Sequence, residues 1–412
     1  MNLNSFTWAT GIEDTFIPQA RPGLRALEEY TLTQHYQLWQ SDLELVRESG
    51  VRTLRWGIPW YRVQPEPDRW DWQWCDQVLE SMVAVKGITP ILDLMHYGTP
   101  SWLDNGFINA AYPQRVAEYA AAVAARYRTL VRYYTPLNEP SVTADFCGRR
   151  AEWPPYLCGD DGYVKVMLAV ARGIVLTVQA LRAAQPEMQT VQVEALWQHW
   201  TRNPALQPRV EQGNLQQYLC FDLVTGRVDA GYPLLGYLQA HGFTLADMRW
   251  FQEQAVSFDI FGANFFPWSY GEVVESRSGM LRRLPVPTAG MAMAEVIRPT
   301  YARYSLPIMV TETSANTARS GRALWMDETV ATVRQLRMEG IPVVGYTWFP
   351  LFTMIDWAYR RGRRPLKDYL LHLGLYESEF DSSGVLRRHP TELVAHFQRH
   401  IATPMPPVAQ PE

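Results

Sequence analysis

Short apolar runs alternate with amphipathic segments along most of this 412-residue chain, and this alternation limits the folds available to it. Eight runs have the composition of buried strands, at 6–9, 53–57, 88–94, 133–138, 191–197, 260–264, 308–311 and 343–347. Helical patterns lie between or after them, at 34–49, 72–86, 113–129, 164–184, 210–224, 293–304, 325–338 and 391–401. Because each right-handed crossover places the next strand beside the last, this order predicts an α/β fold, a single parallel (β/α)8 TIM barrel.

The positions of glycines and of long connections in the sequence support this barrel. Gly50, Gly87 and Gly340 each stand one or two residues before a predicted strand, where a left-handed helix C-cap belongs. Long irregular connections at 16–33, 95–112, 141–163, 265–292 and 349–389 all follow predicted strands, so we expect them on the C-terminal face, where barrel enzymes hold their sites. We expect one catalytic barrel over 1–402 with no second domain, and a disordered Pro-rich tail at 403–412.

Composition argues against several classes of partner. The formal net charge is −4, and the basic cluster at 360–364 is short and isolated, so neither a nucleic acid nor an anionic membrane is an expected partner. The first residues lack the pattern of a secretory signal, and the sequence suggests no run approaching the ~20 apolar residues of a membrane span. We therefore expect a cytoplasmic protein, while the oligomeric state is left open.

The four cysteines lack the paired spacing of a zinc site, so no metal is expected from them. They are also too few for a disulfide framework. Cys147 and Cys158 flank one loop and could bridge, although reduced thiols are the default expectation.

Two of the predicted strands end on a glutamate. The run at 133–138 leads into Glu139 and stops before Pro140, and the run at 308–311 leads into Glu312. A buried carboxylate is costly unless it is paired, hydrogen-bonded or protonated. On the first segment alone, a glutamate that caps the next segment is an equally good interpretation. The second glutamate favours the carboxylate pair of a glycosidase, provided that the fold brings the two strand ends together.

Other polar residues stand at neighbouring strand ends: Arg55, His96, Asn138 and Asn264. With them the chain resembles glycoside hydrolase family 1, the β-glucosidase family of the retaining clan A glycosidases. The resemblance runs through nearly the whole barrel, at His35-Tyr36, 42–50, 55–62, His96 with Pro100, Leu137-Asn138-Glu139-Pro140, 262–266, Thr311-Glu312, and Gly345-Tyr346 through Asp356-Trp357. The Asn-Glu-Pro motif alone recurs across the clan, but the full set in this order is more specific.

The resemblance implies that Glu139 is the acid/base and Glu312 the nucleophile of a retaining β-glycosidase that acts on a small soluble glycoside without metal or organic cofactor. In a retaining site the two carboxyls lie about 5–5.5 Å apart and repel each other, so one pKa rises and the other falls. Arg55 is expected to keep Glu312 ionised, with Asn264 as a further supporting residue. The expected substrate-binding residues are His96, Asn138, Trp348, Asp356 and Trp357.

Each supporting residue also has a plainer interpretation. Arg55 could pair with a structural carboxylate, His96 could be a hydrogen-bonded histidine at a strand end, and Asn264 could serve a turn after Gly262.

The chain departs from the family pattern around the sugar. Gly11 stands where the family has a sugar-binding Gln, and Phe266 replaces a Tyr that bonds the nucleophile. Phe349 stands where the family has a Trp that stacks on the sugar, and Trp348 beside it is the expected substitute. Asp356 replaces a longer Glu that binds two sugar hydroxyls in the family. The reaction type is therefore better determined than the sugar.

Two alternatives remain for the function. A transglycosidase would pass the same glycosyl-enzyme intermediate to an acceptor other than water. A non-catalytic carbohydrate-binding relative would keep the fold but not the chemistry. Retention of both glutamates and Arg55 argues against the latter, because two close like charges cost stability.

Overall fold

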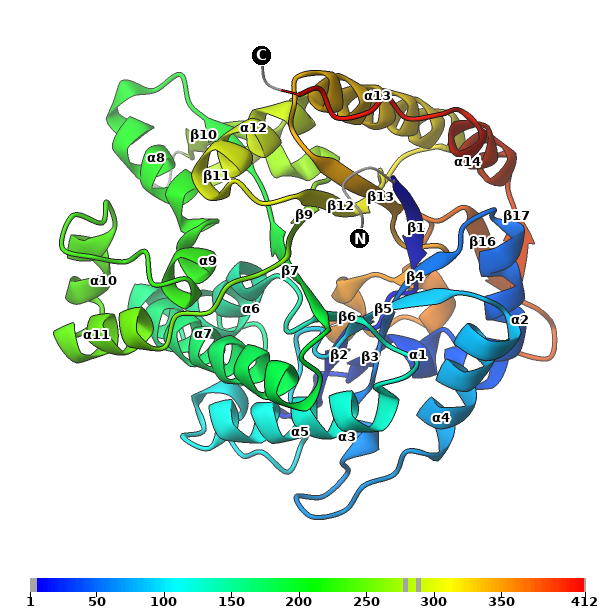
Figure 1. The fold of residues 1–412 in the computed structure, drawn as a ribbon, viewed down its shortest axis with the longest axis horizontal. Coiled ribbons are helices and arrows are strands. Elements are labelled where there is room, and N and C mark those ends of the chain that lie inside the picture. The colour runs from blue at the N-terminus through cyan, green and yellow to red at the C-terminus, as the bar shows by residue number, and fades with distance from the viewer. Residues whose placement is uncertain (1–5, 277–280, 287–289, 411–412) are drawn as a thin grey trace.

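The computed structural model describes residues 6–276, 281–286 and 290–410, and Figure 1 shows a ring of strands surrounded by helices. Eight parallel strands close into a barrel, and β13 pairs with β1 to complete it. In barrel order they are β1 (Thr7–Gly11), β4 (Thr53–Gly57), β5 (Thr89–Asp93), β6 (Tyr133–Thr135), β7 (Gln189–Ala195), β9 (Ile260–Asn264), β12 (Ile308–Thr313) and β13 (Val343–Trp348). The predicted (β/α)8 fold is confirmed.

Helices of the outer layer follow the predicted pattern. They are α2 (His35–Glu48), α4 (Gln73–Glu80), α5 (Tyr112–Tyr127), α7 (Gly159–Ala184), α9 (Leu219–Val224), α12 (Ala294–Tyr304), α13 (Arg319–Met338) and α14 (Glu392–Ala402). The helix predicted at 72–86 passes from α4 into a π-helical turn, and the one predicted at 210–224 is divided into α8 (Gln207–Gln216) and α9. Gly50, Gly87 and Gly340 have φ values of 96°, 63° and 85°, as left-handed caps require.

Long βα loops cover the C-terminal face of the barrel, and they contain more regular structure than the sequence indicated. Their strand pairs are β2 (Phe16–Ile17) with β3 (Leu27–Glu28), β14 (Met354–Ile355) with β15 (Leu370–Leu371), and β16 (Tyr376–Phe380) with β17 (Leu386–Pro390). A three-stranded sheet joins β8 (Gln198–Trp200), β10 (Tyr270–Glu275) and β11 (Leu281–Pro285). Shorter helices are α1 (Glu29–Leu32), α3 (Trp60–Val63), α6 (Pro140–Ala144), α10 (Leu235–Ala240) and α11 (Leu245–Glu253).

Apolar side chains fill both faces of the barrel strands. One buried cluster lies among the strands and contains Ala9, Ile91, Val191, Val193, Ile260, Met309 and Val344. A larger cluster joins the outward faces of the strands to the helices, with Trp56, Leu92 and Val310 among its members. Strands buried on both faces lack a polar alternation, which explains why they read as continuous apolar runs in the sequence.

Helix α7 is 26 residues long and, by length and composition alone, apolar enough to cross a membrane. No such run was expected from the sequence. In the structure 67% of its most apolar window is buried, and α7 packs against α5 and α9. Its apolar face therefore belongs to the layer of helices around the barrel.

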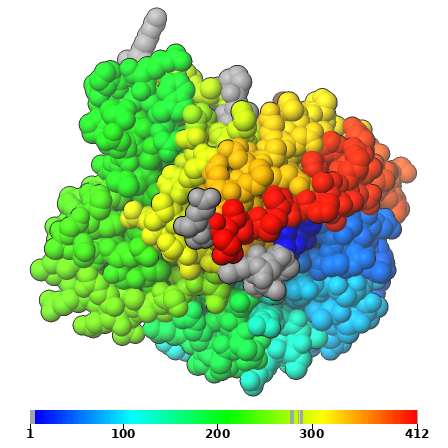
Figure 2. Space-filling view, turned by 45° about the horizontal axis from the view of Figure 1, so that its top comes forward, coloured from blue at the N-terminus to red at the C-terminus, as the bar shows by residue number. Residues whose placement is uncertain are grey.

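The tail predicted to be disordered is docked on the barrel. Arg334 donates to the carbonyl of Pro404 at 2.6 Å, Arg337 donates to Pro406 at 2.7 Å, and Ala409 N–H returns a bond to Arg337 at 3.0 Å. In Figure 2 the red C-terminal segment lies across the yellow and orange surface of the last barrel elements. The prediction of disorder is wrong for 403–410, because arginines of α13 donate to carbonyls that this Pro-rich tail, with few N–H groups, cannot satisfy itself; 411–412 lie outside the described residues.

All four cysteines lie in the described part of the chain, and all are free thiols. Cys147 is buried and Cys158 is exposed, so the two do not bridge. Within the basic cluster at 360–364, Arg360 is buried and donates to the carbonyls of Ile17 and Arg25. The cluster is therefore not a continuous basic surface, because one of its arginines ties two loops together.

Candidate active site

Both predicted catalytic glutamates line one cavity of about 560 Å³ at the C-terminal end of the barrel. Glu312 lies on β12 and is 5% exposed, and Glu139 is 7% exposed. Strand β6 ends at Thr135, so Glu139 lies beyond the strand, at the first turn of α6, rather than at the strand end that the sequence predicted. The fold therefore brings the two glutamates together as expected.

Glu139 adopts a backbone conformation that is rare for a non-glycine residue, with φ 44° and ψ 65°. It occupies the position before α6, yet its side chain makes no capping bond to that helix. Left-handed conformations of this kind persist only where surrounding contacts enforce them, and they concentrate at active sites. The interpretation of Glu139 as a simple helix cap is therefore not supported.

Arg55 on β4 connects the nucleophile candidate to the floor of the cavity. It is 1% exposed and forms an ion pair with Glu312 through Nη1. Its Nη2 donates to Asp93 Oδ2 at 2.5 Å and to Asn138 Oδ1 at 2.7 Å. A fully buried guanidinium needs charged and polar partners of this kind, and the pairing through both terminal nitrogens fixes the direction in which Glu312 points, although Nε is buried without a hydrogen-bond partner among the described residues.

Glu139 is held by two neutral donors. The hydroxyl of Tyr97 donates to Oε2, and Asn264 Nδ2 donates to Oε1 at 2.9 Å. Asn264 is oriented in turn by Thr311, whose hydroxyl donates to its Oδ1 at 2.7 Å. Asn264 therefore bonds Glu139 rather than serving a turn, and its supporting role stays a prediction.

Burial and neighbouring charges set the protonation of the two carboxyls, Glu139 and Glu312. Burial raises the pKa of the Glu312 carboxyl to about 8, Arg55 opposes that rise, and the neighbouring Glu139 adds to it. Arg55 therefore does not by itself hold Glu312 ionised, as the sequence predicted; because the two carboxyls interact, the raised pKa describes the pair, which keeps a proton at neutral pH. This is the protonation state in which one carboxyl can donate a proton while the other attacks.

Asn138 lies beneath the cavity. It is fully buried, and its Oδ1 accepts from Arg55 and from Asn264 Nδ2 at 3.4 Å. Its Nδ2 lies 2.9 Å from His96 Nε2 and donates to the Tyr97 hydroxyl at 3.1 Å. Protein groups thus occupy every hydrogen-bonding position of this amide, and its predicted contact with a sugar stays a prediction.

His96 lines the cavity among three carboxylates. Its Nδ1 lies 3.0 Å from Asp14 Oδ1 and 3.4 Å from Asp93 Oδ2, and its Nε2 lies 3.5 Å from Glu13 Oε1. Burial lowers the pKa of His96, but Asp14 and Glu13 outweigh burial and raise that pKa well above its usual value. Burial also raises the pKa of Asp14 to about 6.

The departure at Gly11 is explained by Phe349. A Cβ atom on Gly11 would lie 2.3 Å from Cδ2 of Phe349, so the phenyl ring fills the space into which a longer side chain at Gly11 would extend. Trp348 does not line the cavity, and the prediction that it substitutes as a sugar-stacking ring is wrong. It is fully buried, and its indole N–H donates to the carbonyl of Leu373 at 3.2 Å.

Asp356 and Trp357 line the cavity as predicted. Asp356 Oδ1 accepts from the N–H of Ala358 at 2.7 Å and so caps the following turn. The Trp357 ring lies 5.0 Å from Trp153 and 5.5 Å from Tyr97, and it forms part of an aromatic wall. Its indole N–H is buried without a hydrogen-bond partner among the described residues, which leaves a donor available to a bound hydroxyl.

Sequence reasoning missed several residues of the site. Glu13 and Tyr97 line the cavity, but neither stands at a predicted strand end. The only signal for Tyr97 was its place directly after His96. The mouth of the cavity adds the stacked rings of Phe266 and Trp268, 4.6 Å apart, and the basic residues Arg149, Arg150 and Arg283. Apart from Phe266, which the sequence marked as a departure from the family pattern, they come from loops whose sequence carried no signal.

Glu194 is a further carboxyl near Glu139. It lies on β7, is 1% exposed, and its Oε1 accepts from the Ser141 hydroxyl at 2.5 Å and from the N–H of Ala195 at 2.9 Å. Burial raises the pKa of Glu194 well above its usual value. Through its bond from Ser141 it anchors the chain two residues after Glu139.

Comparison with known proteins identifies relatives of this arrangement. The family model described as "Glycosyl hydrolase family 1" matches residues 10–220. Beta-glucosidase A of Thermotoga maritima is 28% identical over 116 residues, 27% of this chain and 26% of that protein. A "Bifunctional beta-D-glucosidase/beta-D-fucosidase" of Bifidobacterium breve is 31% identical over 132 residues, 30% of this chain and 28% of that protein. This chain thus aligns with only about a quarter of the length of these two relatives.

Longer matches cover most of the chain. A "6-phospho-beta-glucosidase" of Dickeya chrysanthemi is 23% identical over 385 residues, 80% of this chain and 78% of that protein. The solved family 1 β-glucosidase of Thermotoga maritima superposes with a TM-score of 0.78 at 18% identity, over 97% of both chains, and has the same fold. Since the family model spans half of the sequence, the chain belongs to glycosyl hydrolase family 1.

Proposed function

We propose that this protein is a retaining β-glycosidase that hydrolyses a small soluble β-glycoside, with Glu312 as nucleophile and Glu139 as acid/base. The observation that carries the proposal is the unequal support of the two carboxyls in one cavity. Glu312 is ion-paired with the buried Arg55, whereas Glu139 is held by neutral donors. A positive partner favours the ionised form, so Glu312 is suited to attack and Glu139 to carry the shared proton.

The first step forms a covalent intermediate. The Glu312 carboxylate attacks the anomeric carbon while Glu139 gives its proton to the glycosidic oxygen, and the bond between that carbon and that oxygen breaks. In the second step Glu139, now ionised, takes a proton from water, and the water oxygen displaces Glu312 from the anomeric carbon. The sugar leaves with its original configuration, and Glu139 is protonated again.

Tyr97 suits both protonation states of Glu139. A phenol can donate to a carboxylate and can accept from a carboxylic acid. Burial raises the pKa of Tyr97 well above its usual value, so its hydroxyl stays protonated throughout. By rotating its O–H bond, Tyr97 can therefore keep a hydrogen bond to Glu139 in both protonation states.

The glycone pocket combines an apolar wall with few polar side chains that can bind sugar hydroxyls. Phe349 fills the space beside Gly11, while His96, Asp356 and the Trp357 indole remain as polar contacts. Steep discrimination among sugars requires buried polar groups that the wrong sugar leaves unpaired. We propose that simple β-glucosides are poor substrates and that a less hydroxylated sugar, such as a 6-deoxyglycoside, is turned over at least as well. Its relative from Bifidobacterium breve is described as acting on both β-D-glucosides and β-D-fucosides.

The free thiols, three of them buried, are consistent with a reducing compartment, and we propose a cytoplasmic location. A fusion of this chain to a fluorescent protein, followed by cell fractionation, tests the location. Recovery of the fusion outside the cytoplasm would contradict it.

Nitrophenyl glycosides and two variants test the mechanism. Glu312→Ala should abolish turnover, and Glu139→Ala should retain activity on substrates whose leaving group needs little protonation. Azide should rescue Glu139→Ala and give a glycosyl azide of retained configuration. Rescue of Glu312→Ala to that same retained product would reverse the two assignments, and a main product glycosylated on an added alcohol would favour the transglycosidase.

A further inference from the structure

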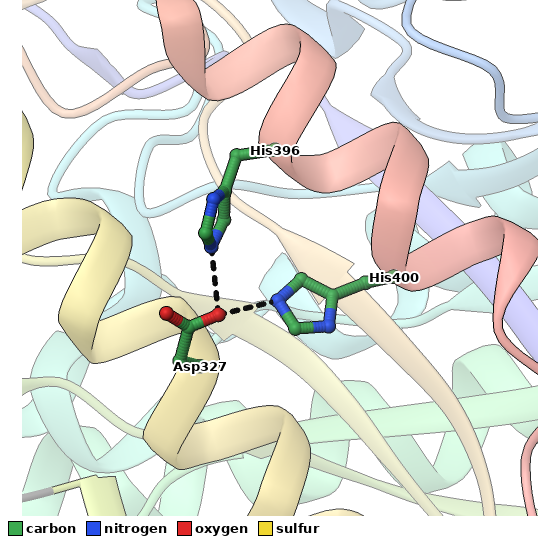
Figure 3. A group of neighbouring side chains, drawn as sticks. All are labelled: Asp327, His396 and His400. Carbon is green, nitrogen blue, oxygen red and sulfur yellow. Dashed lines mark hydrogen bonds and ion pairs between the residues drawn. The ribbon is translucent and has the colours of Figure 1, made fainter.

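Three side chains with metal-binding atoms meet on the outer helical layer, where α14 packs against α13. His396 and His400 lie one turn apart on α14 and point toward Asp327 on α13 (Figure 3). The Nε2 atoms of both imidazoles lie 2.7 Å from the same oxygen, Asp327 Oδ1. The cavity of the glycosidase site contains none of these residues.

We propose that Asp327, His396 and His400 form a binding site for a divalent transition-metal ion of the Zn²⁺ type, which joins α14 to α13. Two imidazoles and one carboxylate favour Zn²⁺, Cu²⁺ or Ni²⁺ over Mg²⁺ and Ca²⁺, which prefer oxygen ligands. Three protein ligands leave a fourth tetrahedral position for water. The proposal is independent of the glycosidase chemistry.

The geometry requires only a small opening of the cluster. The three ligand atoms lie within 4.8 Å of one another. Zinc bonds of about 2.0–2.2 Å in a tetrahedron separate neighbouring ligand atoms by roughly 3.3 Å. The nitrogen-to-oxygen distances would therefore grow by about 0.6 Å. The imidazoles are 20% exposed and Asp327 is 48% exposed, so an ion can reach the site from solvent.

One neighbour opposes metal binding in the present arrangement. Arg399 Nη2 lies 2.8 Å from Nδ1 of His396 and donates to it. When Nε2 binds a metal, Nδ1 carries the proton, so two donors would then face each other. Arg399 is exposed and can turn toward solvent. The other nearby cation, Arg334, is directed to the carbonyls of Thr403 and Pro404.

A second group with metal-binding atoms lies beside the active-site cavity, which only its histidine lines, and gives no site. Asp14, Asp93 and His96 also fall within 4.8 Å of one another. Asp93 already accepts from the buried Arg55, whose positive charge repels a metal ion. Variants of the α14 histidines therefore distinguish the two groups.

Titration calorimetry of the full chain with ZnCl₂ tests the proposal. We expect one bound equivalent, and we expect binding to weaken by about tenfold or more in His396→Ala, His400→Ala and Asp327→Asn. His389→Ala removes an exposed histidine outside the cluster and is the matched control. Cys158→Ser removes the exposed thiol, and both controls should bind as the parent does. Absence of binding, or equal binding by the parent and both α14 histidine variants, would overturn the proposal.

A variant with all ligands intact keeps the test decisive if a ligand variant fails to fold. Arg399→Gln removes the donor that faces His396 Nδ1, so the Zn²⁺ affinity of this variant should exceed that of the parent. Zn²⁺ should also raise the Tm of the parent and of Arg399→Gln, because an ion that binds only the folded state stabilises it. Unchanged or weaker binding by Arg399→Gln would contradict the assignment of His396 as a ligand.

Discussion

Glu194 shows how a single buried carboxyl ties stability to pH. Its pKa is raised well above the usual value, chiefly by burial, so the folded protein binds this proton more tightly than the unfolded chain does. The contribution to stability is complete below the unfolded pKa and is lost as pH rises toward the folded pKa. Each pH unit crossed between those two values costs about 1.4 kcal/mol.

We therefore expect Glu194→Gln to be more stable than the parent at pH 8 and equally stable at pH 4, because an amide does not ionise. Urea denaturation at both pH values measures the difference. Glu253→Gln, at an exposed position, is the control and should show no pH-dependent gain. A gain that is larger at pH 4 than at pH 8 would reverse the sign and exclude a buried acid as its cause.

Tyr97 is expected to act on the reaction through Glu139. In Tyr97→Phe, Glu139 loses one of its two donors while the ring contacts remain. A lost hydrogen bond to a charged group is worth about 1.5–3 kcal/mol, so kcat/KM should fall by roughly tenfold or more. The loss should be larger for alkyl glycosides than for nitrophenyl glycosides, because only the former depend strongly on proton donation. An equal loss on both classes would indicate a structural defect.

At the scale of elements, the ends of β1 and β13 determine what the sugar pocket can hold. Gly11→Ala places a methyl group against the Phe349 ring, and overpacking of this kind costs about 1–3 kcal/mol. In a Phe349→Ala background the ring is absent and the same change should cost much less. Thermal unfolding of the parent, both single variants and the double variant forms the cycle. Additive changes in stability would show that the two positions do not interact.

The same elements show what the sequence could predict. Strands β4, β9 and β12 lie within one or two residues of their predicted bounds, because parallel strands buried on both faces are continuous apolar runs. The sheet of β8, β10 and β11 was missed, because its strands lie on loops and β10 alternates buried with half-buried residues. The docked tail was missed for a similar reason, since its order depends on α13 and not on its own composition.

The candidate site residues likewise divide into those that barrel strands position and those that loops position. Glu312 and Arg55 were predictable because barrel strands position them, and Glu139 because it follows shortly after the end of a barrel strand. The failure at Trp348 follows from the alternation of side chains: Trp348, the last residue of β13, points away from the cavity, and Phe349, directly after the strand, lines it. Glu13 and Tyr97 depend on loop conformation, which no periodicity encodes.

For the whole molecule, the closed barrel sets the pH range of catalysis by gathering acidic groups from separate strands. Glu312, Asp93, Asp14 and Glu13 share two direct ion-pair partners, Arg55 and His96. This surplus of negative charge and the burial of the site both resist loss of the last proton. Burial accordingly raises the pKa of Glu312 to about 8, and the pair keeps one proton at neutral pH.

The alkaline limit of activity should therefore lie near pH 8. Above it the shared proton is lost, Glu139 can no longer protonate the leaving group, and kcat/KM on an alkyl glycoside should fall about tenfold per pH unit. A nitrophenyl glycoside should show a shallower fall, because its leaving group departs without that proton. Rates measured from pH 5 to pH 10 on both substrates check this. An alkaline limit near pH 5 would mean that both carboxyls are ionised at neutral pH, and proton donation by Glu139 would then lack its source.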